Sequence, residues 1–190
     1  MSVDDAVRVG AHLADALDRL HQQGEVHGRV TSDAIWLDGP DVTLAPPKVG
    51  PIDADGLAAP EVLDGDPPDA RSDHFALGCV LYEMVAGRPA YAAGTGADDI
   101  RAGQVTPIAR YQPLAPPSFV RLVATCLQPD PQDRWQSAKD LGRELAWVGT
   151  LDEAASERLE DDTRASNPRL YGLTGLAAGF VLSGAFRACG

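Results

Sequence analysis

Apolar residues recur at the spacing of an α-helix at the start of the chain and again near its middle. From Val3 to about Gln23 they share one helical face, and Gly24 supplies a stop; these positions are Val9, Leu13, Ala16, Leu17 and Leu20. In the stretch SDHFALGCVLYEMVAG, residues 72–87, apolar side chains cover nearly every side. A helix that is apolar on all sides is typical of a buried position. The pattern therefore predicts an amphipathic helix and a central buried helix, which Gly87 ends.

Two further helices are predicted in the second half of the chain. One begins near Pro116, Pro117 and Ser118, because proline suits a first helical turn, and its inward positions are Phe119, Leu122, Val123 and Leu127. The other begins at Ser137 and directs Leu141 and Leu145 inward. Both patterns are those of helices that pack one face against a core.

A small hairpin is predicted between the first helix and the central one. The runs AIWLD, residues 34–38, and DVTLA, residues 41–45, flank Gly39 and Pro40, although Pro40 leaves the turn type open. Residues 46–68 are rich in Pro, Gly, Ala and Asp and are expected to form a loop. The order of helix, hairpin, loop and helices indicates a mainly α-helical α+β fold rather than alternating βαβ units.

Composition and charge narrow the class of protein. With 190 residues and 44% hydrophobic content, the chain fits one main globular domain. The net charge of -12, without a cluster of Lys and Arg, excludes nucleic acid as a partner. The three cysteines, Cys79, Cys126 and Cys189, are too far apart to indicate a disulfide framework or a zinc site. The start MSVDDAVRVG is not typical of a signal peptide, so the expected location is cytoplasmic.

The last part of the chain differs from the rest. Residues 150–169 are polar and acidic, which predicts a linker. Residues 170–186, within an apolar Gly-rich segment over 170–190, carry no charge. Seventeen residues is at the short limit for crossing a bilayer. This segment could be a C-terminal membrane anchor, a soluble helix or part of a longer segment.

Four stretches together resemble a known family, the eukaryotic-type Ser/Thr protein kinases of bacteria. VHGRVTSDAIWL, residues 26–37, is similar to the catalytic loop, and AAPEVL, residues 58–63, is similar to the Ala-Pro-Glu motif. SDHFALGCVLYEMVAGRPAY, residues 72–91, resembles the central buried helix, and CLQPDPQDRWQSAKDL, residues 126–141, resembles the closing segment. The resemblance implies that residues 1–149 form a kinase-like large lobe. The small N-terminal lobe, which precedes the first helix in the family, is expected to be absent.

The resemblance also implies roles for several structural residues. Glu61 of the Ala-Pro-Glu motif is expected to form a buried bidentate salt bridge with Arg134. Asp73, at the start of the central helix, is expected to accept backbone N–H groups of the loop near His27. These contacts would hold the loop and the helical base together.

The positions that carry chemistry in the family hold other residue types here. The catalytic Asp falls on Arg29, the Lys on Thr31, the Asn on Ala34 and the metal-binding Asp on Pro46. Phosphoryl transfer needs a carboxylate beside the substrate hydroxyl, a cation on the phosphate and oxygen ligands for magnesium. Arginine cannot take a proton, threonine carries no charge, and alanine and proline have no side-chain oxygen. No catalytic, cofactor-binding or metal-binding residue of the family is therefore predicted to be intact.

Three functions follow from this pattern. The first is a catalytically inactive kinase-like domain, a pseudokinase, that works as a binding or regulatory module and needs no cofactor. It is expected to bind a protein partner, or a second copy of itself, through the surface that a small lobe would cover. The second is a kinase using ATP and magnesium, active only with a small lobe from another chain or from an upstream start. The third is a decayed fragment without function.

Overall fold

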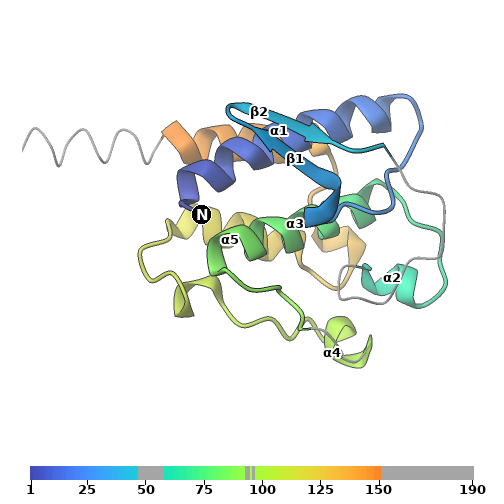
Figure 1. The fold of residues 1–190 in the computed structure, drawn as a ribbon. Coiled ribbons are helices and arrows are strands. Elements are labelled where there is room, and N and C mark those ends of the chain that lie inside the picture. The colour runs from blue at the N-terminus through green and yellow to red at the C-terminus, as the bar shows by residue number, and fades with distance from the viewer. Residues whose placement is uncertain (47–57, 93–94, 96, 151–190) are drawn as a thin grey trace, which may run out of the picture. The chain divides into compact units, whose positions relative to one another are not determined.

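The computed structural model describes residues 1–46, 58–92, 95 and 97–150 (Figure 1). Residues 1–150 lie within one unit that extends to Asp152. The predicted linker and apolar segment, residues 150–169 and 170–190, lie outside the described residues except for residue 150. The elements in chain order are α1 Val3–Gln22, β1 Ile35–Asp38, β2 Asp41–Leu44, α2 Pro60–Leu63, α3 Ala70–Ala86, α4 Ala97–Arg101, α5 Pro117–Cys126 and a helix over 138–150, with single 3-10 turns at Ser32–Ala34, Ile108–Arg110 and Pro131–Asp133.

Helix α1 forms where the apolar period predicts it. The Ser2 hydroxyl accepts the N–H of Asp5 at 3.1 Å and so caps the first turn, in which two acidic residues complement the helix dipole. Leu13 and Leu17 are fully buried on the inward face. The helix ends at Gln22, one residue before the predicted end.

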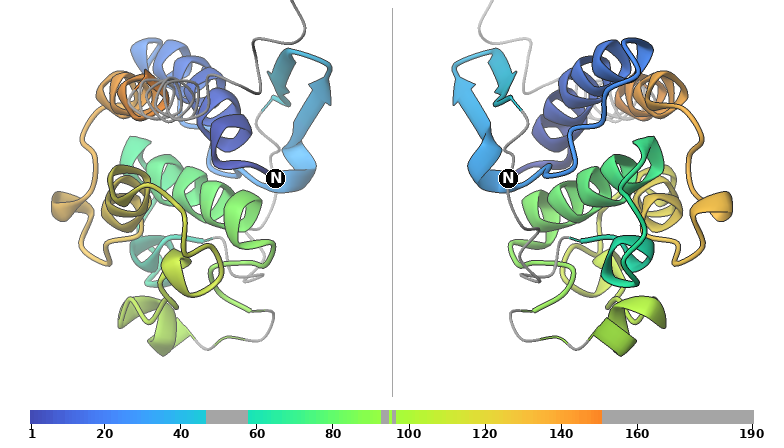
Figure 2. Two further views of the ribbon diagram at one scale, coloured as in Figure 1. Left: turned by 90° about the vertical axis from the view of Figure 1, so that its left-hand side faces the viewer. Right: turned by 90° about the vertical axis from the view of Figure 1, so that its right-hand side faces the viewer.

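Helix α3 is the centre of the fold. It packs against both α1 and α5, and nearly all of its side chains between residues 72 and 82 are buried (Figures 1 and 2). It begins at Ala70, two residues earlier than the resemblance suggests, because Asp69 and Ser72 form a capping box. Its last residue is Ala86, and Gly87, with a φ of +68°, stops it as predicted. The helices α5 and 138–150 also form as predicted, and their predicted inward residues are buried.

The predicted hairpin is present as a two-stranded antiparallel sheet. Trp36 pairs with Thr43 and Asp38 with Asp41, so Gly39 and Pro40 form a two-residue turn. Gly39 has a φ of +58°, and proline fixes a negative φ at Pro40, which excludes a type I′ turn and fits type II′. The hairpin packs beside α1: β2 contacts this helix, and Arg8 Nη1 donates to the Pro40 carbonyl at 2.9 Å.

Two short helices were not predicted. The loop expected over 46–68 contains α2, a single turn that begins at Pro60; residues 47–57 lie outside the described residues. Helix α4 is also a short one. Arg101 connects the two, because its guanidinium bonds Asp64 at 2.7 Å and Asp98 at 2.9 Å. Elements this short have no visible hydrophobic period, so the sequence pattern could not predict them.

The segment considered as a membrane anchor, residues 170–186, lies outside the described residues. Among the helices that the structure describes, none combines the length and the apolarity needed to cross a membrane.

The crossing of α3 and α5 leads to a first testable prediction. A Cβ atom added at Gly78 would lie 2.4 Å from Cys126 Cβ, well inside van der Waals contact. Gly78→Ala should therefore lower the free energy of unfolding by about 1–3 kcal/mol, despite the better helix propensity of alanine. Gly149→Ala is the matched control, because its Cβ would meet Val7 at an ordinary 3.4 Å. Urea denaturation of both variants checks this, and equal stability of the two would contradict it.

Candidate functional site

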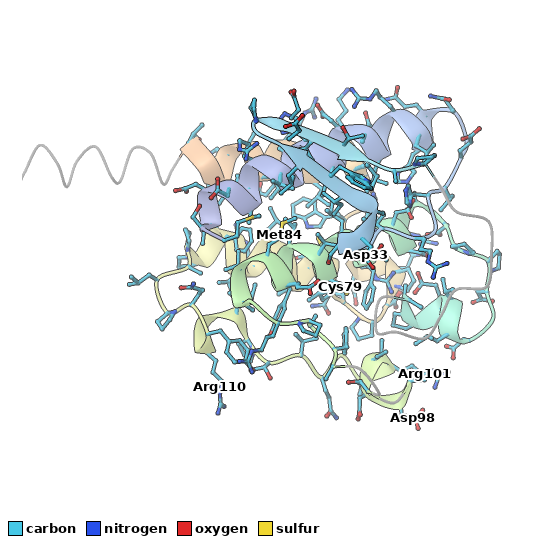
Figure 3. The ribbon with its side chains drawn as sticks, in the orientation of Figure 1. Asp33, Cys79, Met84, Asp98, Arg101 and Arg110 are labelled. Atoms are coloured by element: carbon cyan, nitrogen blue, oxygen red, sulfur yellow. The ribbon has the colours of Figure 1, made fainter. Side chains whose placement is uncertain are left out.

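A cleft of about 440 Å³ opens between the loop before the hairpin, the start of α2 and one face of α3. Residues 27–34 form one wall, and Ala58, Ala59 and Val62 contribute to another. Asp33, which lines the cleft, lies just before β1 (Figure 3). The four positions at which the resemblance implies substituted catalytic residues all line this cleft; they are Arg29, Thr31, Ala34 and Pro46.

The buried carboxylate of Asp73 holds the wall formed by the loop. It accepts the N–H of His27 at 2.8 Å and the N–H of Gly28 at 2.7 Å, as the resemblance implies. Gly28 has a φ of +69°, a conformation that glycine adopts without strain. Two charge-assisted hydrogen bonds thus fix the loop backbone to the first turn of α3.

His27 joins the loop to the end of the hairpin. Its Nε2 lies 2.8 Å from the carbonyl oxygen of Ala45, which can only accept, so Nε2 carries the proton. The neutral Nδ1 can then accept the N–H of Arg29 at 3.3 Å. Both ring nitrogens have a partner, and the backbone at Arg29 is held in place.

The chemistry that the cleft can perform depends on the side chains it presents. Arg29 is a permanent cation and cannot act as a general base. Thr31 adds a hydroxyl, while Ala34 and Pro46 add no polar side-chain atom. Glu83 lines the cleft and accepts the hydroxyl of Ser32 at 2.6 Å, a contact that the sequence did not predict.

The described residues that line the cleft do not fit a magnesium site. Magnesium requires several oxygen ligands in near-octahedral geometry. In the cleft the described carboxylates are those of Asp33 and Glu83, and Glu83 is engaged by Ser32. The described residues contain no group of three or more His, Cys, Asp or Glu side chains placed to hold a metal ion. No step through a metal is derived from this set of residues.

The predicted salt bridge between Glu61 and Arg134 is present. Arg134 Nη1 and Nη2 donate to the two carboxylate oxygens of Glu61 at 2.8 and 2.7 Å. Burial alone would raise the pKa of Glu61, but hydrogen bonds from Arg134 and Ser72 outweigh it and lower that pKa. Arg134 also donates to three backbone carbonyls, those of Gln128, Arg71 and Pro129. The pair joins α2 to the segment that precedes the last described helix.

Two histidines near Asp73 were missed by the sequence reasoning. His21 Nε2 donates to Asp73 Oδ2 at 2.9 Å, and the His21 ring meets the His74 ring edge-on at 5.6 Å. His74 is fully buried and donates through Nδ1 to the Trp135 carbonyl at 2.8 Å. Its Nε2 has no hydrogen-bond partner among the described residues. Sequence spacing carries no signal for these contacts, since 52 residues separate His21 from Asp73.

The burial of His74 makes stability depend on pH. Burial lowers the pKa of His74, because the charged ring would lose its hydration. Below about pH 6.5 the unfolded chain therefore binds more protons than the folded chain, and the free energy of unfolding falls as the pH drops.

The second prediction follows from this sign. His74→Phe should flatten the plot of unfolding free energy against pH between about 7 and 5.5, because it removes this titration. His12→Gln, at an exposed position on α1, is the matched control and should leave the slope unchanged. Denaturation across this pH range measures both, and an unaltered slope in His74→Phe would contradict the assignment.

The chain is similar in sequence to known protein kinases. Residues 54–144 match the family model of the protein kinase domain. The chain is 28% identical over 171 residues to serine/threonine-protein kinase PknB of Mycobacterium tuberculosis, covering 78% of this chain and 27% of that protein. It is 31% identical over 178 residues to PknH of Mycobacterium bovis, covering 85% of this chain and 30% of that protein. The chain thus spans less than a third of the length of these curated relatives.

A solved structure has the same fold. The crystal structure of the kinase domain of Mycobacterium tuberculosis PknI, as a double mutant, superposes with a TM-score of 0.65 at 20% identity. The match covers 78% of this chain and 57% of that chain. The predicted fold, a mainly helical kinase-like lobe with a small hairpin, is confirmed.

Proposed function

Because the chain belongs to the bacterial Ser/Thr protein-kinase-like family, we propose that it is a catalytically inactive kinase-like module that acts by binding another protein. A fold can keep its architecture while its site loses the original chemistry. In this proposal the cleft serves no phosphoryl transfer, and neither ATP nor magnesium is a cofactor.

One observation carries the proposal: the backbone of residues 27–29 is held by hydrogen bonds, while the side chain at residue 29 is an arginine and not a carboxylate. His27 and Gly28 are held by Asp73, and the N–H of Arg29 is held by His27. Arg29 lines the cleft with its backbone held, and by the resemblance it stands where the family has its catalytic carboxylate. A guanidinium has no free lone pair, so Arg29 cannot accept the proton of a substrate hydroxyl, as the reaction requires.

The binding half of the proposal rests on exposed apolar side chains. Trp36 is 68% exposed and Leu37 is 47% exposed, both on the hairpin. The two side chains lie on opposite faces of the strand. A large exposed aromatic residue such as Trp36 is typical of a surface that binds another protein.

The third prediction tests inactivity directly. The 190-residue protein, incubated with radiolabelled ATP, a general protein substrate and either magnesium or manganese, should transfer no phosphate. A kinase domain from a relative such as PknB serves as the positive control in the same assay. Melting curves with and without magnesium ATP should coincide, because a ligand that binds the folded state raises its stability. Time-dependent phosphate transfer by the chain would overturn the proposal.

A further inference from the structure

We propose that the outer face of the hairpin binds an extended, basic segment of a partner protein, which adds a strand beside β1 and places Lys or Arg side chains over Trp36. This inference rests on the proposed function and names the chemistry of the partner. It is carried by the two faces of the hairpin, its open edge and its charge.

The two faces of the hairpin differ sharply. Successive residues of a strand point to opposite faces, so the register places Trp36 and Thr43 on one face together with Asp38 and Asp41. On the other face, Ile35, Val42 and Leu44 pack against the core, while Leu37, nearer the turn, is 47% exposed. The hairpin lies beside α1, and no described helix covers its outer face (Figure 2). Trp36 is therefore the large apolar group of an outward surface.

The hairpin also has an open edge. No third strand pairs with β1 among the described residues. A two-residue turn makes its flanking pair, here Asp38 and Asp41, a hydrogen-bonded pair, and the pairs alternate from there. The backbone groups of Leu37 therefore point away from β2, toward the free side of β1. An exposed edge of this kind is a template for an added strand.

The charge of the outer face selects the partner. Asp38 and Asp41 lie directly opposite each other, an arrangement of like charges that is unfavourable in an isolated hairpin. Neither carboxylate forms an ion pair with a described residue, because Arg8 donates to the Pro40 carbonyl and lies near Asp5 instead. A cationic side chain would relieve this repulsion and could also lie over the Trp36 ring.

The same charges disfavour a second copy of the chain as the occupant. The chain carries a net charge of -12, and pairing two hairpins would bring together two acidic turns. Like charges in an interface oppose association. A basic segment of another protein can pair with the backbone groups on the free edge of β1. Its cationic side chains can lie over the Trp36 ring and beside the carboxylates of Asp38 and Asp41.

The test uses the whole 190-residue protein and a defined probe, a peptide of roughly eight residues in which Arg alternates with Val and Thr. Isotope-edited NMR should show saturable shifts confined to residues 35–44. Trp36→Ala should weaken binding about tenfold or more, which corresponds to 1.4 kcal/mol. Asp38→Asn with Asp41→Asn should weaken it and reduce its salt dependence. Trp147→Ala, which removes another half-exposed tryptophan, is the matched control and should change nothing.

Several outcomes would overturn this inference. One is an equal loss of binding in Trp36→Ala and Trp147→Ala, and another is equal binding of a peptide with Glu in place of Arg. The absence of shifts at residues 35–44 up to about 1 mM peptide would also overturn it. So would a dimer that sediments only when Trp36 is present. The phosphate-transfer assay on the same preparation separates the two proposals. Inactive protein without peptide binding contradicts the partner chemistry alone, whereas phosphate transfer contradicts the proposed function.

Discussion

Arg134→Met should lower the free energy of unfolding by about 3–5 kcal/mol, because it leaves the carboxylate of Glu61 buried without its main partner. The side chain of Arg134 has no exposed surface and that of Glu61 is 14% exposed, so solvent can replace only a small part of the lost bonds. Three backbone carbonyls also lose a donor. Since small domains are stable by only about 5–15 kcal/mol, this is a large fraction of the total.

Two further variants show whether the loss of stability comes from breaking the buried pair or from removing any arginine. Arg143→Met breaks an exposed pair with Asp140 and should change stability by less than about 1 kcal/mol. The double variant Glu61→Leu with Arg134→Met should be more stable than Arg134→Met, because no unpaired charge stays buried. Urea denaturation of the set measures these differences. If Arg134→Met and Arg143→Met had equal effects, the structural role of the pair would be refuted.

Asp73→Asn is expected to have the second-largest effect, a loss of about 2–4 kcal/mol. Asp73 is almost fully buried and accepts from the N–H groups of His27 and Gly28 and from the ring of His21. An asparagine offers one oxygen in place of two, and its NH₂ group would face a donor. At least one buried backbone N–H would lose its partner.

The loss should also be visible locally. Amide hydrogen exchange at His27 and Gly28 should accelerate in Asp73→Asn more than the change in global stability explains. Asp15→Asn, on the exposed face of α1, is the matched control and should alter neither stability nor exchange at these amides. Unchanged protection of His27 and Gly28 in Asp73→Asn would show that another group holds the loop.

Sequence patterns predicted the long elements because these repeat the apolar period over several turns. Helices α1 and α5 and the helix over 138–150 show that period, α3 is a long run that is apolar on nearly every side, and the hairpin shows two strand-like runs around Gly39. Helix α2, with four residues, and α4, with five, are too short to repeat it. Contacts between distant segments fix them.

The site could be predicted only in part. The resemblance located the loop, Asp73 and the pairing of Glu61 with Arg134, because each falls in a recognisable motif. The contacts of His21 with Asp73 and of Ser32 with Glu83 join residues about 50 positions apart and lie in no motif. Such pairs depend on how the helices pack, which local sequence does not encode.

The contacts of Asp73 hold the loop without depending on the side chains of the loop. Its carboxylate bonds main-chain N–H groups, which every amino acid except proline provides. These two bonds therefore do not depend on which side chains stand at Arg29 and Thr31. A substitution at either position should leave the backbone of the loop attached to α3, whereas a substitution of Asp73 should detach it.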